Sequence, residues 1–423
     1  EFTDKPTAGA GVGVGGKVVT NEDLGPALND PALGIRGISP GYSGGSPNLS
    51  QFITIPEIAG AQSVWEWYAE ANVPLLETTV GNWDQSLVAN LAFRQSDYER
   101  SGKSDSWKVG LDYQFNDDLR FRYTSSQDVR EPTFTELFDA RGGGANVNDP
   151  QFAGANFQIS IFRGGNLNLI PETSRTETIG VVWQPSFNSL LSGLQISVDY
   201  WDTEVDDQVG ELGVQRYVDE CENNGLLCAQ VQRDPVTNFI TKVYRQAVNL
   251  AQATATGIDY EVSWQVEPNF FANELETFRV RWLASDLRER SDTPLGGQPF
   301  DIAGELDSPD FTGVLTANYG IGPWSFQLQN RYVGETIYNA SWTEGKDVDD
   351  NTIDSMNWWN GRVSYQSELN SGATWNVGLN VQNLLDESQP IVPGFSTRGG
   401  TQVFSGQFDR FGRRYNLNLN MTF

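Results

Sequence analysis

Residue types that usually carry chemistry are present, but few of them are spaced so that they could act together. The 423-residue chain contains no histidine, which excludes Ser-His-Asp triads, histidine-bound metals and imidazole acid–base catalysis. Carboxylates are numerous, with 55 Asp and Glu against 28 Lys and Arg, yet they lie in polar segments without the apolar neighbours that tune a catalytic acid. We therefore predict that the protein is not an enzyme and has neither catalytic residues nor a cofactor.

Two acidic runs contain the oxygen ligands that Ca²⁺ prefers, but neither has the spacing of an EF-hand loop. We interpret them as acidic loops suited to a saline exterior and predict no metal site. A glycine-rich segment at residues 9–16 lacks the Lys-Ser/Thr ending of a phosphate-binding loop and is interpreted as an external loop. The acidic runs are Asp202, Glu204, Asp206 and Asp207, and Asp347, Asp349, Asp350 and Asp354.

The two cysteines, Cys221 and Cys228, lie in the polar stretch YVDECENNGLLC. We predict that they form a loop disulfide in an oxidising compartment, because so close a pair between glycine and charged residues is typical of a loop. On the chain-entropy model, such a bond contributes about 2.5 kcal/mol. Two unrelated reduced thiols are the alternative.

Charge and hydropathy narrow the class of protein. A net charge of −27 makes nucleic acid an unsuitable partner, because phosphate binding requires a basic surface. The mean hydropathy is −0.42, and no apolar run approaches the roughly 18 residues that a membrane-spanning helix needs. These values do not exclude a transmembrane β-barrel, because its strands alternate between apolar and polar residues and have no long apolar run.

Alternation with a period of two residues recurs along the chain and predicts thirteen β-strands. Aromatic residues gather on the apolar faces, whereas charged residues keep to the opposite faces. The strands begin near residues 64, 87, 107, 119, 176, 194, 254, 277, 313, 324, 358, 374 and 413. The polar faces carry Glu66, Glu70, Arg94, Lys108, Asp112, Arg120, Arg122, Asp199, Asp259, Glu261, Arg279, Arg281, Gln327, Arg331 and Arg362.

Strand length and the aromatic residues distinguish a membrane barrel from a soluble β-sandwich, whose strands average about 5 to 6 residues. The strands here are expected to span about 9 to 11 residues, with Trp and Tyr bordering the apolar face, as in a wall that faces lipid around a polar lumen. The fold class predicted is therefore all-β, a transmembrane antiparallel β-barrel embedded in outer-membrane lipid. A soluble all-β fold is the alternative.

The connections between strands alternate in length. Short links, such as residues 114–118 and 320–323, are expected to be periplasmic turns, and the long links are expected to be extracellular loops. We predict an extracellular loop region at residues 1–63 and the barrel at residues 64–423. The long links cover approximately residues 126–175, 205–250, 288–311, 335–357 and 386–412.

The strand count adds an expectation about what precedes the chain. Single-chain bacterial barrels normally have an even number of strands, because an open edge in lipid leaves backbone groups unpaired. Thirteen is odd, and the first strand runs inward. We therefore expect an odd number of further strands upstream of this sequence.

Residues 106–138, SWKVGLDYQFNDDLRFRYTSSQDVREPTFTELF, resemble TonB-dependent receptors, which place an R-x-P-x-x-x-E-L-F motif after a barrel strand. Further similar segments follow in the family's order, among them ATGIDYEVSW from residue 255 and the final RRYNLNLNMTF. The resemblance implies a barrel of about 22 strands with an N-terminal plug, of which this chain would form the last thirteen. The plug and the TonB box are absent from this sequence.

Three groups of candidate functional residues follow. The loop motif, interpreted as structural, comprises Arg130, Pro132, Glu136, Leu137 and Phe138. The alternating apolar residues of the last strand resemble the signal read by the outer-membrane assembly machinery, and they also face lipid: Tyr415, Leu417, Leu419, Met421 and Phe423. Ligand contacts are expected from loop aromatics and one arginine, which suit stacking on a sugar or a siderophore: Tyr338, Trp342, Phe395, Phe404, Phe408 and Arg410.

The predicted function is that of a bacterial outer-membrane receptor for TonB-energised uptake of a scarce nutrient, such as a siderophore, a cobalamin-like molecule or a glycan. TonB would act through a plug and TonB box. A passive, porin-like channel is one alternative. A barrel whose loops dock a surface lipoprotein or a phage is another.

Overall fold

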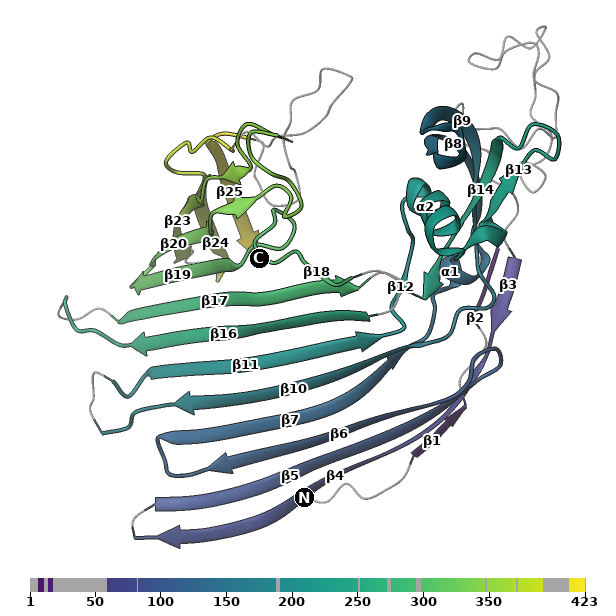
Figure 1. Ribbon diagram of the computed structural model, residues 1–423. Coiled ribbons are helices and arrows are strands. Elements are labelled where there is room, and N and C mark those ends of the chain that lie inside the picture. Colours follow the sequence, from purple (N-terminus) through teal and green to yellow (C-terminus); the bar gives the residue numbers. More distant parts are fainter. Residues whose placement is uncertain are drawn as a thin grey trace, which may run out of the picture.

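The computed structural model describes residues 7–10, 14–17, 59–81, 83–187, 191–249, 252–271, 275–293, 298–346, 348–369, 372–390 and 411–422. Thirteen long antiparallel strands follow one another in chain order around one curved sheet (Figure 1). Each predicted strand start lies in or beside one of them, which confirms the all-β barrel wall. They are β4 (Val64–Val80), β5 (Trp83–Tyr98), β6 (Gly102–Gln114), β7 (Leu119–Arg130), β10 (Glu172–Trp183), β11 (Leu194–Asp206), β16 (Gln252–Val266), β17 (Glu276–Thr293), β19 (Phe311–Ile321), β20 (Trp324–Val333), β23 (Met356–Glu368), β24 (Thr374–Gln382) and β25 (Arg414–Thr422).

Shorter elements occupy the links between these strands and the segment before them. Among the described residues, none of the helices is long and apolar enough to cross a membrane. The short strands are β1 (Thr7–Ala10), β2 (Val14–Lys17), β3 (Ala59–Gln62), β8 (Ala140–Asp149), β9 (Ala155–Gly164), β12 (Val209–Gly210), β13 (Val231–Arg233), β14 (Ile240–Gln246), β15 (Val248–Asn249), β18 (Phe300–Asp301), β21 (Thr336–Ile337) and β22 (Thr352–Ile353). The helices are α1 (Phe134–Phe138) and α2 (Val214–Asn224), with 3₁₀ turns η2 (Pro150–Phe152) and η3 (Cys228–Gln230).

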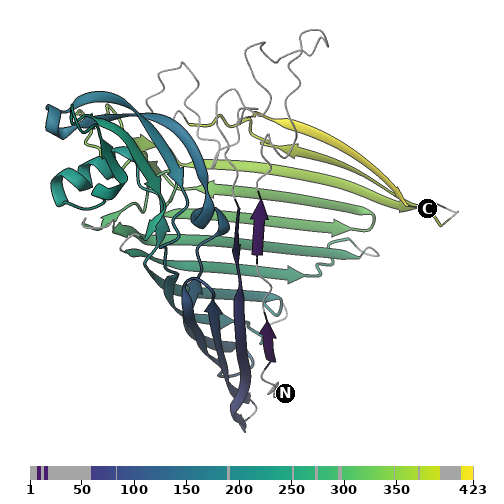
Figure 2. The same ribbon diagram turned by 90° about the vertical axis from the view of Figure 1, so that its right-hand side faces the viewer.

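The curved sheet is an open arc rather than a closed barrel (Figure 2). At one edge β1 pairs with β4, aligning Thr7 with Tyr68, and at the other edge β25 pairs with β24. All pairings between the thirteen long strands are antiparallel, and the strands turn at short links on the side opposite the longer connections. The arc matches the predicted barrel wall in strand order and direction.

The two faces of the sheet differ in chemistry because side chains alternate along each strand. On β25, Tyr415 and Leu417 are 67% and 74% exposed, and on β10 Ile179 is 59% exposed, although all three are apolar. Exposed apolar side chains at every second position are what a lipid-facing wall requires. The outward apolar side chains therefore pack against lipid rather than against a protein core, and polar side chains lie on the inner face.

Several strands are longer than the predicted 9 to 11 residues, since β4 has 17 residues and β17 has 18. The reason is visible on β11, where outward positions change from Tyr200 to Asp202 and Glu204. Carboxylates at those positions belong in water, so this strand extends past the apolar band. Sequence alternation located the apolar band and missed the extension beyond it.

Two links that were predicted as long loops fold together into one compact body, which we call the loop lobe (β8, β9, α2, β13 and β14). Its strands form a four-stranded sheet in the order β13-β14-β9-β8, in which β9 and β14 run parallel. The lobe stands at one end of the wall (Figure 1). Its buried core consists of Val147, Ile159, Tyr217, Val218, Ile240 and Val243.

Covalent and ionic links hold the loop lobe together. Cys221 and Cys228 form a disulfide that joins the end of α2 to η3. Arg233 donates to Asp149, with 2.7 Å between Nη1 and Oδ2, and to Glu222, with 2.7 Å between Nη2 and Oε1. Asp149 is fully buried. Burial raises the pKa of its carboxyl, but the hydrogen bonds and charge of Arg233 outweigh burial and hold that pKa below its ordinary value.

Candidate functional site

The inner face of the wall is polar, and ion pairs connect several of its neighbouring strands. Arg122 on β7 binds Asp199 on β11 through both carboxylate oxygens, and Arg281 on β17 donates to Glu261 on β16 at 2.8 Å. Residues that are paired across neighbouring strands lie on the same face of the sheet. Arg122 is paired with Gly180, Gly180 with Asp199, and Asp199 with Asp259, so these polar residues predicted for the lumen share the inner face. The arrangement keeps charges in a wet lumen rather than in lipid.

Two inward glycines shape this face because larger residues there would collide with their neighbours. A Cβ at Gly180 would overlap the carboxylate of Asp199. A Cβ at Gly257 would lie 2.6 Å from Cζ2 and 2.9 Å from Cε2 of Trp201. The Arg122–Asp199 pair therefore lies over Gly180, and the indole of Trp201 lies over Gly257.

The inner face forms a concavity with a volume of about 1040 Å³. The residues of β11 show where the concavity lies along the strands. Trp201, which lines it, directly follows Tyr200, the last outward aromatic residue, and the outward carboxylates begin at residue 202. The concavity therefore reaches the outer boundary of the apolar band. Its lining includes Arg122, Asp199, Trp201, Asp259, Ser285 and Arg331.

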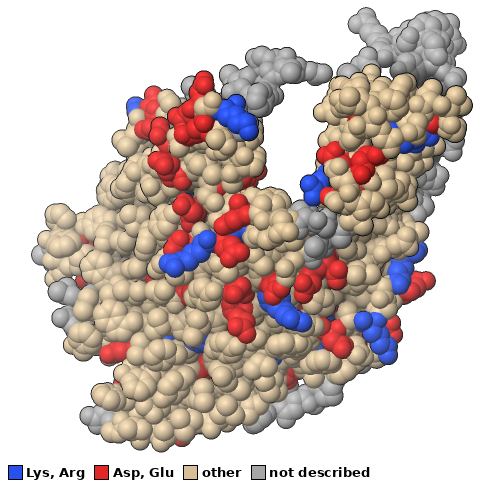
Figure 3. Space-filling view, in the orientation of Figure 1, with Lys and Arg blue, Asp and Glu red and all other residues tan. Residues whose placement is uncertain are grey.

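Charged side chains also mark the loop end of the molecule. In Figure 3, red and blue patches lie on the loop bodies and on the adjoining parts of the strands, whereas the opposite strand ends are mainly tan. A hollow separates the loop lobe from the part of the molecule that contains β20, β23, β24 and β25 (Figures 1 and 3). In this view the charged residues are therefore more frequent toward the loops than at the opposite strand ends.

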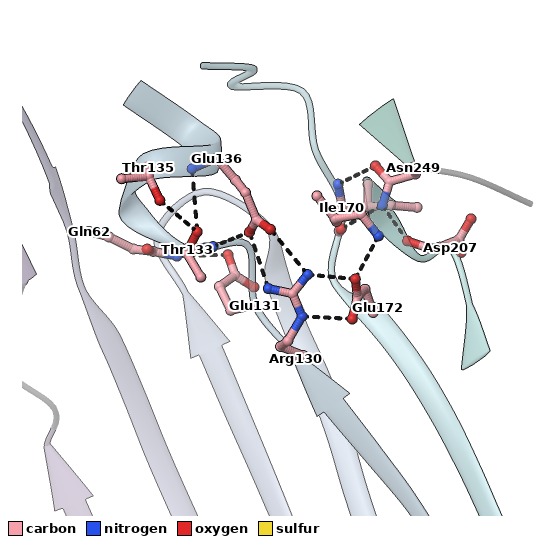
Figure 4. Close-up of polar contacts among 11 residues, drawn as sticks. Gln62, Arg130, Glu131, Thr133, Thr135, Glu136, Ile170, Glu172, Asp207 and Asn249 are labelled. Carbon is pink, nitrogen blue, oxygen red and sulfur yellow. Dashed lines mark hydrogen bonds and ion pairs between the residues drawn. The ribbon is translucent and has the colours of Figure 1, made fainter. Parts of the chain in front are cut away.

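The predicted loop motif ties three elements together (Figure 4). Arg130 Nε donates to Glu172 Oε2 on β10 at 2.6 Å, and its Nη1 donates to Glu136 Oε2 on α1 at 3.1 Å. Glu172 also accepts a hydrogen bond from the Val209 amide at 2.6 Å. Thr133 caps α1 in a capping box with Glu136. Arg130 thus joins the end of β7 to α1, β10 and β12.

The carboxylates of this motif have opposite pKa shifts. Burial raises the pKa of Glu136, but the hydrogen bonds from Arg130 and Thr133 outweigh it and lower that pKa overall. Burial raises the pKa of Glu131, whose hydrogen bonds from Ser101 and Gln62 only partly oppose the rise. Glu136 is one of the two carboxylates that pair with Arg130, and Glu172 is the other.

The apolar residues of the motif are packed rather than presented to solvent. Pro132 is fully buried, and Leu137 is buried in a cluster with Leu169, Val209 and Ala247. Phe138 packs against that cluster and lies 4.8 Å from Phe134 between ring centroids. These contacts place the apolar residues of the motif in a packed cluster at the base of the loops.

The predicted ligand-contact residues fall into two groups. The ring centroids of Tyr338 and Trp342 lie 4.9 Å apart. Tyr338 also packs against a second buried cluster, which consists of Leu306, Val333, Ile353, Met356 and Trp358. Both aromatic side chains are half-buried. Phe395, Phe404, Phe408 and Arg410 lie outside the described residues.

The acidic runs and Trp201 complete the description of the site. Within the described part of the chain, no three Asp, Glu, Cys or His side chains are grouped so that they could hold a metal ion, and Asp347 lies outside that part. Trp201 was not predicted as a site residue. The signal was present, because Trp201 follows outward Tyr200 and so must point inward.

A model of the TonB-dependent receptor β-barrel, described as "TonB dependent receptor-like, beta-barrel", matches residues 16–384. The chain belongs to this family. The family places the protein in the bacterial outer membrane, as predicted. A search of curated proteins found no match.

Solved structures with a similar fold include siderophore receptors. A ferric enterobactin receptor, PfeA, in complex with BCV-L6 is 12% identical with a TM-score of 0.58, and the match covers 86% of this chain and 46% of that one. The siderophore receptor PirA from Acinetobacter baumannii is 14% identical with a TM-score of 0.51, covering 86% and 55%. At these identities the likeness concerns the fold. This TonB-dependent receptor chain spans about half the length of the structures it matches.

The last strand of the receptor barrel presents its alternating residues as predicted for a lipid-facing strand. Leu419 and Met421 are exposed like Tyr415 and Leu417, and Asn416 and Asn418 line the inner face. Phe423 lies outside the described residues. Recognition by the assembly machinery stays a prediction.

Proposed function

We propose that this chain forms the C-terminal barrel wall of an outer-membrane receptor that takes up a scarce nutrient with energy supplied through TonB. The observation that carries the proposal is the polar inner wall, which contains ion pairs and a concavity of about 1040 Å³ at the level where the loops begin. Such a wall provides a polar path behind an apolar exterior. The proposal assigns binding and transport, and no catalysis, to the chain.

The partners in this proposal follow from the family. Lipid surrounds the outer face, a plug occupies the lumen, and TonB acts on the plug through a TonB box. The assembly machinery acts on the last strand. Ligand is captured at the loops and passes along the inner wall when the plug moves.

A genetic experiment tests the proposal and does not require the ligand to be identified. Deleting the gene should reduce growth on a limiting nutrient in a strain with TonB, and should cause no additional defect in a strain without TonB. An additional defect in the strain without TonB would contradict energised uptake.

Conductance distinguishes the passive-channel alternative. The whole receptor, expressed from its gene and inserted in a planar bilayer, should be nearly silent if a plug occupies the lumen. Continuous conductance would favour a passive, porin-like channel.

A docking role is the second candidate function, favoured by the loop lobe having a buried core of its own. A folded lobe offers a surface of defined shape to a lipoprotein or a phage. Removing the lobe should then abolish partner binding and spare nutrient uptake. Loss of uptake with retained partner binding would reject this role.

A further inference from the structure

Trp201 is an aromatic side chain placed on the polar side of the wall. Its strand neighbour on β16 is Gly257, and the absence of a side chain there lets the indole approach the backbone. The indole therefore lies close to the backbone of the wall, and Trp201 lines the concavity. A flat ring held in this way is a stacking platform with little side-chain entropy to lose on binding.

Hydrogen-bonding groups surround this platform. Asp199 lies two residues before Trp201 on the same face, and Asp259 is the register partner of Asp199 on β16. Ser285 Oγ donates to Asp259 Oδ1 at 2.7 Å. The platform is therefore bordered by the carboxylates of Asp199 and Asp259, whereas Arg331, on β20, lines another part of the same concavity.

The charges at the platform are unevenly compensated. Asp199 is paired with Arg122, and Glu261 with Arg281. Within the described part of the chain, Asp259 forms no ion pair and accepts its hydrogen bond from neutral Ser285. A carboxylate without a cationic partner repels an anionic ligand, and it accepts hydrogen bonds readily from hydroxyl groups.

We infer that this concavity is a subsite for a neutral, hydroxyl-rich ligand, namely a sugar unit of an oligosaccharide; the inference rests on the proposed uptake function and names its substrate class. The apolar face of a pyranose ring matches the indole of Trp201, and its ring hydroxyls match Asp259 and the neighbouring polar groups. A ferric catecholate chelate carries several negative charges and would meet the charge of Asp259.

The height of the subsite fits this assignment. Trp201 lies beside the last outward aromatic of β11, Tyr200, and below the outward carboxylates that begin at Asp202. The subsite is thus at the outer mouth of the lumen. A ligand released by the loops would reach it before the parts of the wall nearer the short turns.

Calorimetry on the whole receptor, expressed from its gene and purified in detergent, tests the inference. The neutral probes are maltohexaose, cellohexaose and xylohexaose, and the anionic probe is ferric enterobactin. At least one hexaose should bind. Trp201→Ala should lower its affinity about tenfold, whereas Trp201→Phe should retain it to within about threefold, because a second aromatic ring preserves stacking.

Two further variants separate stacking from general damage. Gly257→Val should lower hexaose affinity as Trp201→Ala does, because the added side chain displaces the indole from the wall. Trp282→Ala, an outward position on β17 opposite Val262 and Leu315, should leave affinity unchanged. Equal losses in Trp282→Ala and Trp201→Ala would overturn the inference.

The remaining outcomes are distinct for the two proposals. Binding of ferric enterobactin that depends on Trp201 overturns the ligand class and leaves TonB-energised uptake standing. Absence of binding by all three hexaoses also overturns the ligand class. Continuous conductance of the whole receptor, or a growth defect independent of TonB, overturns the uptake function itself.

Discussion

Glycines shape the inner wall of this receptor barrel as much as its charged residues do. Gly180 makes room for the Arg122–Asp199 pair, and Gly257 makes room for Trp201. Both glycines lie within long strands, where glycine usually weakens the strand through its backbone entropy. At Gly180 the cost is offset because Asp199 can approach the strand and bind Arg122.

Replacing Gly180 tests this account. Gly180→Ala should reduce the free energy of unfolding by about 1–3 kcal/mol, because the added Cβ displaces the carboxylate of Asp199 from Arg122. Gly110→Ala is a matched control on β6, since its nearest atom would lie at 3.5 Å. Thermal unfolding measured by loss of β-sheet circular dichroism should separate the two variants. Equal unfolding temperatures would contradict the close-approach explanation.

The buried ion pair of the loop lobe makes a second prediction at this scale. Arg233→Ala should destabilise the lobe by about 3–5 kcal/mol, because it leaves the carboxylate of Asp149 buried without its cation. Arg288→Ala, which removes an exposed pair with Asp286, should cost less than about 1 kcal/mol. Hydrogen exchange of lobe amides provides the measurement. Similar exchange in both variants would reject the assigned role of Arg233.

The same pair gives a pH dependence. The pKa of Asp149 is lower in the folded lobe than in the unfolded chain, so the folded state binds its proton less tightly. The pair's contribution is therefore complete above the ordinary aspartate pKa and is lost as the pH falls through the lowered one. Lobe amides should exchange faster, after correction for intrinsic rates, below about pH 4. In Asp149→Asn this acid-dependent increase should be smaller.

At the scale of elements, Arg130 connects structures that alternation predicts separately. It binds Glu172 at the start of β10 and Glu136 in α1, while Glu172 also accepts the amide of Val209 from β12. A single guanidinium with several donors can satisfy two carboxylates at once. The motif therefore sets where the chain leaves the wall and where the loop lobe begins.

Arg130→Ala should loosen this junction while the wall stays folded. We expect the free energy of local unfolding at this junction to fall by about 1–3 kcal/mol, because Glu172 loses its cationic partner beside a buried amide. Hydrogen exchange should increase in α1 and β12 and stay unchanged in β6. Arg130→Lys should recover only part of the protection, because lysine lacks the bidentate fork. Full recovery by lysine would show that charge alone suffices.

At the scale of the whole molecule, the wall separates two environments. Apolar outward side chains meet lipid, and polar inward side chains meet the lumen. The loop lobe stands at one end of the wall (Figures 1 and 2). Because the outward face has no protein core, its stability depends on the bilayer. The loop lobe, by contrast, is stabilised by a core and a disulfide of its own.

A pair of substitutions on β25 tests this division. Leu417→Arg should cost about 2–4 kcal/mol at mid-bilayer, because the charge would face lipid. Asn418→Arg places the same charge on the neighbouring inward position and should fold nearly as well as the unchanged protein. Heat-modifiable migration on gels after insertion into vesicles reports the folded fraction. Equal folded fractions would contradict the assignment of the two faces.

Different parts of the structure were predictable to different degrees. Alternation predicted the thirteen strands and their faces because the side-chain period is a local property of the extended chain. The loop lobe was missed because its core joins residues as distant as Val147 and Val243, through short strands without sustained alternation. Leu137 and Phe138 were singled out in the sequence as part of a motif, but their packing partners were not predictable.

The sequence by itself determined the strand number, the inward and outward faces and the acidic character, and it carried the family resemblance. All of these depend on residue type and on spacing within one strand. Only the tertiary structure decided that Gly257 lies under Trp201, that Arg130 reaches Glu172, and that two distant links share one core. These contacts depend on the hydrogen-bonded register between strands and on packing between loops, neither of which is written in the periodicity of a single segment.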